Sequence, residues 1–124
     1  MKYYTVETRA VSIDPNRNYT AMEIEGLYQD YLSNIDGTVE FYEHIDTALV
    51  RYKEINEGVI NVNRGSVTIL LIAEVHAWEA PIRVPLVGHP TGLNIEYLGV
   101  IKPENTVKHI QKMLKLYKQR KDGK

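Results

Sequence analysis

Cysteine is absent from the chain, and so are a long apolar run and a recognisable leader peptide. Without cysteine there is no disulfide, no thiolate nucleophile and no cysteine-ligated zinc, so a reducing compartment is permitted. The longest apolar run, residues 67–73, is far shorter than the ~20 residues that span a bilayer. Residues 1–11 contain neither an apolar core nor a small-residue cleavage site. We therefore expect no signal peptide, no membrane partner and a cytoplasmic location.

Motifs for catalysis and nucleotide binding are also missing. Ser12, Ser33 and Ser66 are not part of a G-x-S-x-G elbow, and the chain has neither a P-loop nor a G-x-G-x-x-G fingerprint. We therefore assign no catalytic residue and no cofactor, and we favour a protein that is not an enzyme.

Charge is distributed unevenly along what we expect to be one domain, residues 1–124, with a frayed tail at 119–124. Residues 1–60 contain five Lys and Arg against eleven Asp and Glu, a net charge of −6, whereas residues 61–124 contain ten against five, a net charge of +5. Such asymmetry suits a nucleic acid, an acidic partner or head-to-tail self-association.

Alternation of apolar and polar residues predicts a sheet built around a central strand at residues 66–79. Helical spacing predicts two helices, one at 45–56 and one that starts at Pro103. Residues 27–34 fit either a helix or a strand, and we favour a strand that leads into a hairpin at Asp36-Gly37. The other predicted strands are 2–13, 19–28, 39–42, 82–86 and 93–101, with 59–65 either a short strand or a connector.

These elements predict an α+β fold. We expect a mostly antiparallel sheet of about five to seven strands with two helices packed on one face, because a half-buried sheet must cover its apolar side.

A metal site is conceivable on the polar half of the central strand. Glu74 and His76 project from one face, and His89 lies in a loop that could fold over that face. A carboxylate and two imidazoles are ligands for zinc or iron. The four histidines are scattered, however, and no H-E-x-x-H motif is present, so we assign no metal.

A second candidate is an anion-binding loop formed by Gly88, His89, Thr91 and Gly92. Backbone N–H groups of such a loop can cradle a phosphate. An ordinary hairpin loop has the same composition.

The last predicted helix is basic. Lys108, Lys112 and Lys115 lie away from its apolar stripe and are spaced to follow a phosphate backbone or to meet an acidic surface. A merely solvated helix face would show the same pattern.

Tyrosine is abundant, with nine residues. Tyrosine is favoured at protein interfaces because it offers a large contact area at low entropic cost. We select Tyr3, Tyr4 and Tyr19 as binding residues and expect them, with Tyr31 and Tyr42, to be partly exposed.

The function predicted from these features is a small non-enzymatic binding protein that acts through protein-protein contacts and forms a homo-oligomer, a two-fold dimer by default. Accessory proteins of phages and mobile elements are often of this kind. The first alternative is a nucleic-acid-binding protein that uses its carboxyl-terminal helix. The second is a small metal-dependent or phosphate-ester-processing enzyme at Glu74, His76 and His89.

Overall fold

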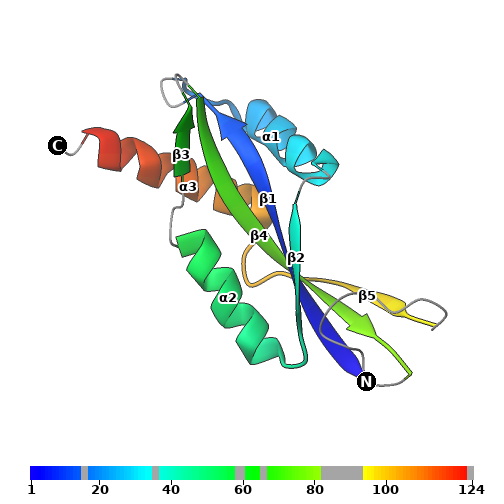
Figure 1. Cartoon of the computed structure of the whole chain (residues 1–124). Helices are drawn as coiled ribbons and strands as arrows, with labels where there is room; N and C mark the ends of the chain where they lie inside the picture. The colour runs from blue at the N-terminus through cyan, green and yellow to red at the C-terminus, as the bar shows by residue number, and fades with distance from the viewer. Residues whose placement is uncertain (15–16, 35–36, 58–60, 65–66, 82–93, 123–124) are drawn as a thin grey trace.

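The computed structural model describes residues 1–14, 17–34, 37–57, 61–64, 67–81 and 94–122 (Figure 1). None of its described helices is long and apolar enough to cross a membrane. The elements in chain order are β1 (Lys2–Ile13), α1 (Ala21–Ser33), β2 (Thr38–Tyr42), α2 (Ile45–Glu57), β3 (Asn61–Arg64), β4 (Val67–Glu79), β5 (Glu96–Ile101) and α3 (Thr106–Asp122).

The sheet is organised around β4, as predicted. Every residue of β1 pairs with β4 in one antiparallel register that runs from Lys2 opposite Glu79 to Ile13 opposite Thr68. β2 pairs with the edge of β1 that faces away from β4. β3 and β5 pair with the edge of β4 that faces away from β1, β3 at residues 67–70 and β5 at residues 75–79. All pairs are antiparallel, so the α+β class and the antiparallel sheet are confirmed.

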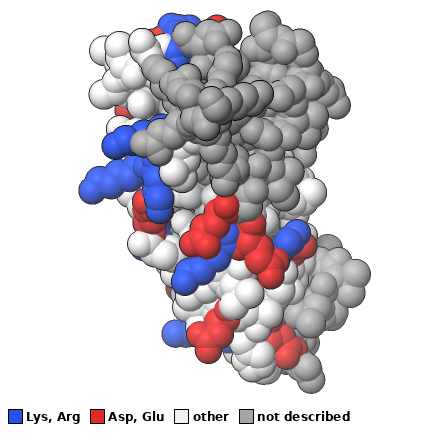
Figure 2. All heavy atoms as spheres, turned by 90° about the vertical axis from the view of Figure 1, so that its left-hand side faces the viewer, with Lys and Arg blue, Asp and Glu red and all other residues white. Residues whose placement is uncertain are grey.

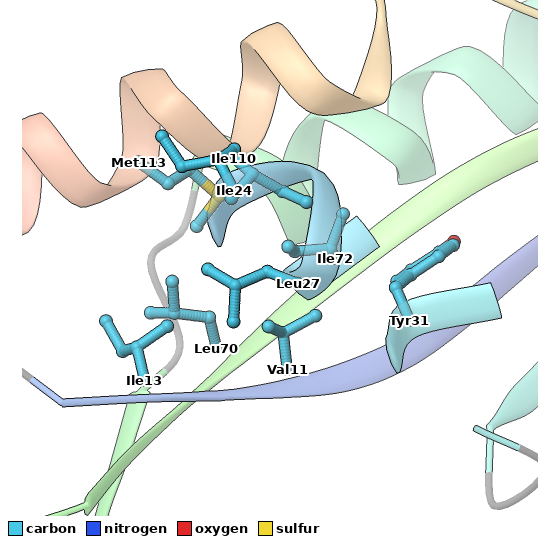
Figure 3. Close-up of a cluster of buried hydrophobic side chains, with 9 residues drawn as sticks. All are labelled: Val11, Ile13, Ile24, Leu27, Tyr31, Leu70, Ile72, Ile110 and Met113. Atoms are coloured by element: carbon cyan, nitrogen blue, oxygen red, sulfur yellow. The ribbon is translucent and has the colours of Figure 1, made fainter. Parts of the chain in front are cut away.

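One face of the sheet is covered by α1 and α3, which also contact each other. Figure 3 shows the apolar cluster that fills the space between these helices and the two long strands. Leu70 and Ile72 lie at its base, and neither side chain has measurable exposure. Its members are Val11, Ile13, Ile24, Leu27, Tyr31, Leu70, Ile72, Ile110 and Met113.

The opposite face is covered by α2. Successive side chains of a strand point to opposite faces, so Val6, Ala73 and Val75 project away from the first cluster. They pack against one stripe of α2, formed by Ala48, Tyr52 and Ile55. The prediction of two helices on one face is therefore wrong: the described chain has three helices, and they cover both faces.

The third helix is α1, which replaces the strand predicted at 19–28 and its favoured continuation at 27–34. Thr20 and Glu23 form a reciprocal capping box: the Glu23 N–H donates to Thr20 Oγ1, and the Thr20 N–H donates to Glu23 Oε1. Ile24, Leu27 and Tyr31 then recur at helical spacing and are buried. The alternation that suggested a strand includes Met22, which is 84% exposed. It therefore did not mark a buried sheet face.

The hairpin predicted at Asp36-Gly37 is also wrong, because α1 precedes it and β2 pairs with β1 instead. Asp36 lies outside the described residues. Gly37 has no positive φ, but a Cβ atom there would lie 2.6 Å from the carbonyl oxygen of Thr8. Glycine is therefore needed at position 37 because two backbones approach each other closely there. The positive φ of a hairpin turn, on which the prediction was based, is not the reason.

Most other predicted elements are confirmed with shifted ends. The first strand, the short strand at 39–42, the helix at 45–56 and the central strand are all present. Of the segment predicted at 59–65 as a short strand or a connector, the described part, Asn61–Arg64, is a strand. α3 begins after Asn105, whose Oδ1 accepts from the Val107 N–H at 2.9 Å, so Pro103 precedes the helix. The strand predicted at 82–86 lies outside the described residues.

A buried asparagine closes a gap in the sheet between β3 and β5. Ala73 lies between the stretches of β4 that pair with these two strands. No described strand pairs with Ala73 on this side, and Asn56 of α2 binds it instead: its Oδ1 accepts from the Ala73 N–H at 2.8 Å, and its Nδ2 donates to the Ala73 carbonyl at 3.1 Å. Asn56 therefore satisfies two backbone groups that would otherwise be buried without partners.

We expect Asn56→Ala to lower the free energy of unfolding by about 1–3 kcal/mol, because it leaves buried polar groups unsatisfied. Urea unfolding would measure the change. Glu57→Ala alters the adjacent, exposed position and serves as the control. Equal midpoints for the two variants would contradict this role.

Candidate functional site

Two carboxylates face each other on the sheet face that α1 and α3 cover. The register of β1 and β4 places Glu7 directly opposite Glu74. Both side chains are largely shielded from solvent, and that of Glu74 is only 3% exposed. Directly opposed like charges destabilise a sheet, so this pair needs compensating groups.

His76 lies between the two carboxylates. Its Nε2 is 3.4 Å from Glu7 Oε2 and 3.5 Å from Glu74 Oε1. Its Nδ1 is 2.7 Å from the hydroxyl of Tyr97, which is half exposed on β5. The contacts therefore run from a surface phenol through an imidazole to the two carboxylates.

Glu74 connects the sheet to both helices above it. Thr106 at the start of α3 donates from Oγ1 to Glu74 Oε2 at 2.7 Å, and the Tyr28 hydroxyl of α1 also bonds to this carboxylate. Burial raises the pKa of Glu74, but hydrogen bonds from His76 and Thr106 and nearby positive charge outweigh it, so its pKa lies below 4.5. Glu74 is therefore held as a buried anion.

Glu7 is held from the other side. Thr5 Oγ1 donates to Glu7 Oε2 at 3.2 Å and accepts from Trp78 Nε1 at 2.9 Å. Arg9 Nη2 lies 3.6 Å from Glu7 Oε1, and its guanidinium carbon is 5.3 Å from the ring centroid of Tyr31. The donors that belong to Glu7 alone thus lie on β1, whereas those of Glu74 come from β4, α1 and α3.

Tyr31 closes this polar cluster against the apolar core. Its hydroxyl donates to the carbonyl oxygen of Glu7 at 3.3 Å. Burial, followed by the charge of Glu74, raises the pKa of Tyr31 far above its ordinary value. Tyr31 therefore remains neutral and acts as a donor.

The metal candidates are only partly brought together. Glu74 and His76 do converge, and they converge with Glu7, which sequence reasoning missed because its position opposite Glu74 depends on the strand register. His89 lies outside the described residues. Within those residues no group of three or more histidine and acidic side chains has the geometry to hold a metal ion. The proposed anion loop, Gly88 to Gly92, also lies outside the described residues.

A second candidate surface lies at the edge of the sheet. A hollow of about 120 Å³ opens where β2 begins beside β1. Small-molecule pockets measure about 300–1,000 Å³, so this one suits a single side chain. Val39 is 48% exposed here, and Leu32 of α1 is also exposed. The hollow is lined by Glu7, Arg9, Leu32, Asn34, Gly37, Thr38 and Val39.

The backbone N–H and C=O groups of Val39 point away from β1, toward the outer side of β2. Because Asn56 binds both backbone groups of Ala73, those groups face away from β1. Backbone groups alternate in direction along an antiparallel pair, so Thr8, opposite Ala73, turns its own groups toward β2. Thr38 is opposite Thr8, and the next residue, Val39, therefore directs its N–H and C=O outward. No described strand lies on that side.

The third candidate surface is the outer face of α3. Lys108, Lys112 and Lys115 are all exposed, as expected.

The five tyrosines that were expected to be partly exposed are not all so in the structure. Tyr3 is buried against Phe41 and Trp78, and Tyr31 is buried in the core, so the predicted exposure of these two is wrong. Tyr4, Tyr19 and Tyr42 are partly exposed.

No protein-family model matches the chain, and the searches of curated proteins and of solved structures gave no match either.

We expect the unfolding free energy to decrease as the pH falls below 4.5, where Glu74 takes up a proton more readily in the unfolded chain than in the fold. Glu74→Gln should remove that part of the pH dependence. Urea unfolding between pH 7 and pH 3 would measure it, with the exposed Glu25→Gln on α1 as the control. An unchanged profile in Glu74→Gln would contradict the assignment.

A separate pH effect is expected from His109 of α3. Its ring is buried beside Tyr52, its Nε2 has no hydrogen-bond partner among the described residues, and burial lowers its pKa below 6.5 despite Glu104 at 3.3 Å. The unfolded chain therefore binds the proton first, and stability should fall as the pH drops from 6.5. His109→Gln should flatten this step, whereas exposed His44→Gln should keep it.

Proposed function

We propose that the protein is a non-enzymatic interaction protein that self-associates through the open edge of β2. The observation that carries this proposal is Val39, whose side chain is 48% exposed and whose backbone groups face outward at the end of the sheet. An exposed edge strand is a ready template for pairing with another chain. Strand addition of this kind is a recurring mode of protein recognition.

The sequence of β2 favours one register for a two-fold pair. If the axis passes beside Val39, that residue faces Val39 of the partner subunit, and Thr38 faces Glu40 of the partner subunit. Gly37 then faces Phe41 of the partner subunit, which covers a position without a side chain. A shift of one residue would oppose Glu40 to its own copy, and like charges directly opposite are unfavourable. The Val39-centred pair avoids that repulsion.

Such a contact is small. β2 has five residues, so the buried area falls below the ~1,200 Å² of stable interfaces. The exposed side chain of Leu32, which lines the hollow beside Val39, offers additional apolar contact. We therefore expect a weak dimer whose population depends on protein concentration. Because the contact is made by backbone groups and apolar side chains, added salt should leave it nearly unchanged.

Val39→Lys should yield a monomer, since a lysine on an edge strand opposes pairing and the Val39-centred register would place the two introduced charges directly opposite each other. The matched control is Val50→Lys, which makes the same substitution at a 58% exposed valine of α2. Light scattering coupled to size exclusion, over a series of protein concentrations, measures the mass. We expect a dimer for the wild type and Val50→Lys, and a monomer for Val39→Lys.

A wild-type protein that stays monomeric at the highest concentration would refute self-association. A Val39→Lys protein that remains dimeric while its fold is intact would refute the β2 edge as the contact.

A further inference from the structure

We propose that the outer face of α3 binds the phosphate backbone of a nucleic acid. This site is separate from the β2 edge and does not depend on dimer formation. Lys108, Lys112 and Lys115 are spaced four and three residues apart, so they share one side of the helix. At 1.5 Å per residue they span about 10 Å along the axis. Along the axis of a duplex, where each strand carries one phosphate per ~3.4 Å, that length covers about three nucleotide steps.

These three lysines carry charge that the fold does not neutralise. None of them forms an ion pair with a described residue, whereas Arg9, Arg17 and Arg51 each pair with a glutamate. In Figure 2 basic side chains gather along the left of the face shown, while acidic and basic side chains intermingle lower down. Lys108, Lys112 and Lys115, called the α3 stripe below, therefore present positive charge that is available to an external anion.

Other exposed lysines do not form such a stripe. Lys2, Lys53 and Lys102 are exposed and have no ion pair among the described residues, but they lie on β1, on α2 and just after β5. They are three lysines with the same total charge as those of α3, but they are scattered over three parts of the fold. They are therefore the natural control set.

The apolar side of α3 argues against a membrane as the ligand. A helix that lies on a bilayer must bury an apolar face in the lipid. In α3 that face is already used: Ile110 and Met113 are buried in the core, and Val107 and Leu114 pack against it. Among the described side chains of α3, the only exposed large apolar one is Leu116, at 40%. A single leucine is too small an apolar face to hold a helix on a bilayer, whereas the exposed lysines suit a polyanion that is bound mainly by electrostatic attraction.

The test is a fluorescence anisotropy titration of a labelled DNA duplex with the full chain. Three lysine-phosphate contacts predict a slope of log affinity against log salt of about −2.7, which is about a 40-fold loss between 50 and 200 mM salt. The variant Lys108→Ala/Lys112→Ala/Lys115→Ala should reduce the slope by about 2.7, and at 50 mM salt it should lose at least the roughly 40-fold in affinity that the wild type loses on going to 200 mM. Because all three positions are exposed, its urea midpoint should match that of the wild type.

The control variant Lys2→Ala/Lys53→Ala/Lys102→Ala removes the same total charge and should retain the wild-type affinity within about twofold. The proposal is overturned if the wild type does not bind at low salt, or if both triple variants lose affinity equally. It is also overturned if the α3 variant loses binding to vesicles of anionic phospholipid but keeps its affinity for the duplex. The Val39→Lys variant should bind the duplex with an unchanged salt slope. Loss of dimer formation and loss of nucleic-acid binding can therefore be told apart.

Discussion

The pairing of β1 with β4 is the constraint on which the rest of the structure depends. All twelve residues of β1 take part in one uninterrupted antiparallel register. That register decides which side chains share a face, because a shift of one residue would turn every side chain to the opposite side. It places Val11 beside Leu70 under α1 and α3, and it places Val6 beside Val75 under α2. Each helix has an apolar surface to cover only because this register holds.

The same register forces Glu7 and Glu74 together, and the surrounding structure compensates for that conflict. The groups that do so come from separate elements: His76 from β4, Thr106 from α3 and Arg9 from β1. Satisfying a buried charge in this way ties the elements to one another, since loss of any donor leaves a charge without its partner. The polar cluster therefore fixes how α3 and α1 lie on the sheet, in addition to any chemistry that it supports.

The sequence predicted the long strands and α2 because their patterns are strong and local. The strand of residues 66–79 was evident from its apolar run, and α2 from its helical spacing. It misled at α1, where the alternation of Met22, Ile24 and Tyr28 imitates a strand, although the T-x-x-E pattern at Thr20 signals a helix start. Glu7 and Asn56 could not have been predicted as partners of Glu74 and Ala73. Their roles depend on strand register and on the placement of a helix beside a gap in the sheet, neither of which is a local property.

The treatment of open backbone groups distinguishes β2 from the two long strands, β1 and β4. Where β1 extends beyond β2, Asn34 donates to the carbonyl of Ala10, and the Asp14 N–H donates to the Tyr19 hydroxyl. At Ala73 of β4, where no described strand pairs on the outer side, Asn56 binds both backbone groups. Side chains thus close the interruptions of the two long strands from within the fold. Val39 combines an outward backbone with an exposed apolar side chain, and no described strand covers it. A surface of this kind gains most from a strand supplied by another chain.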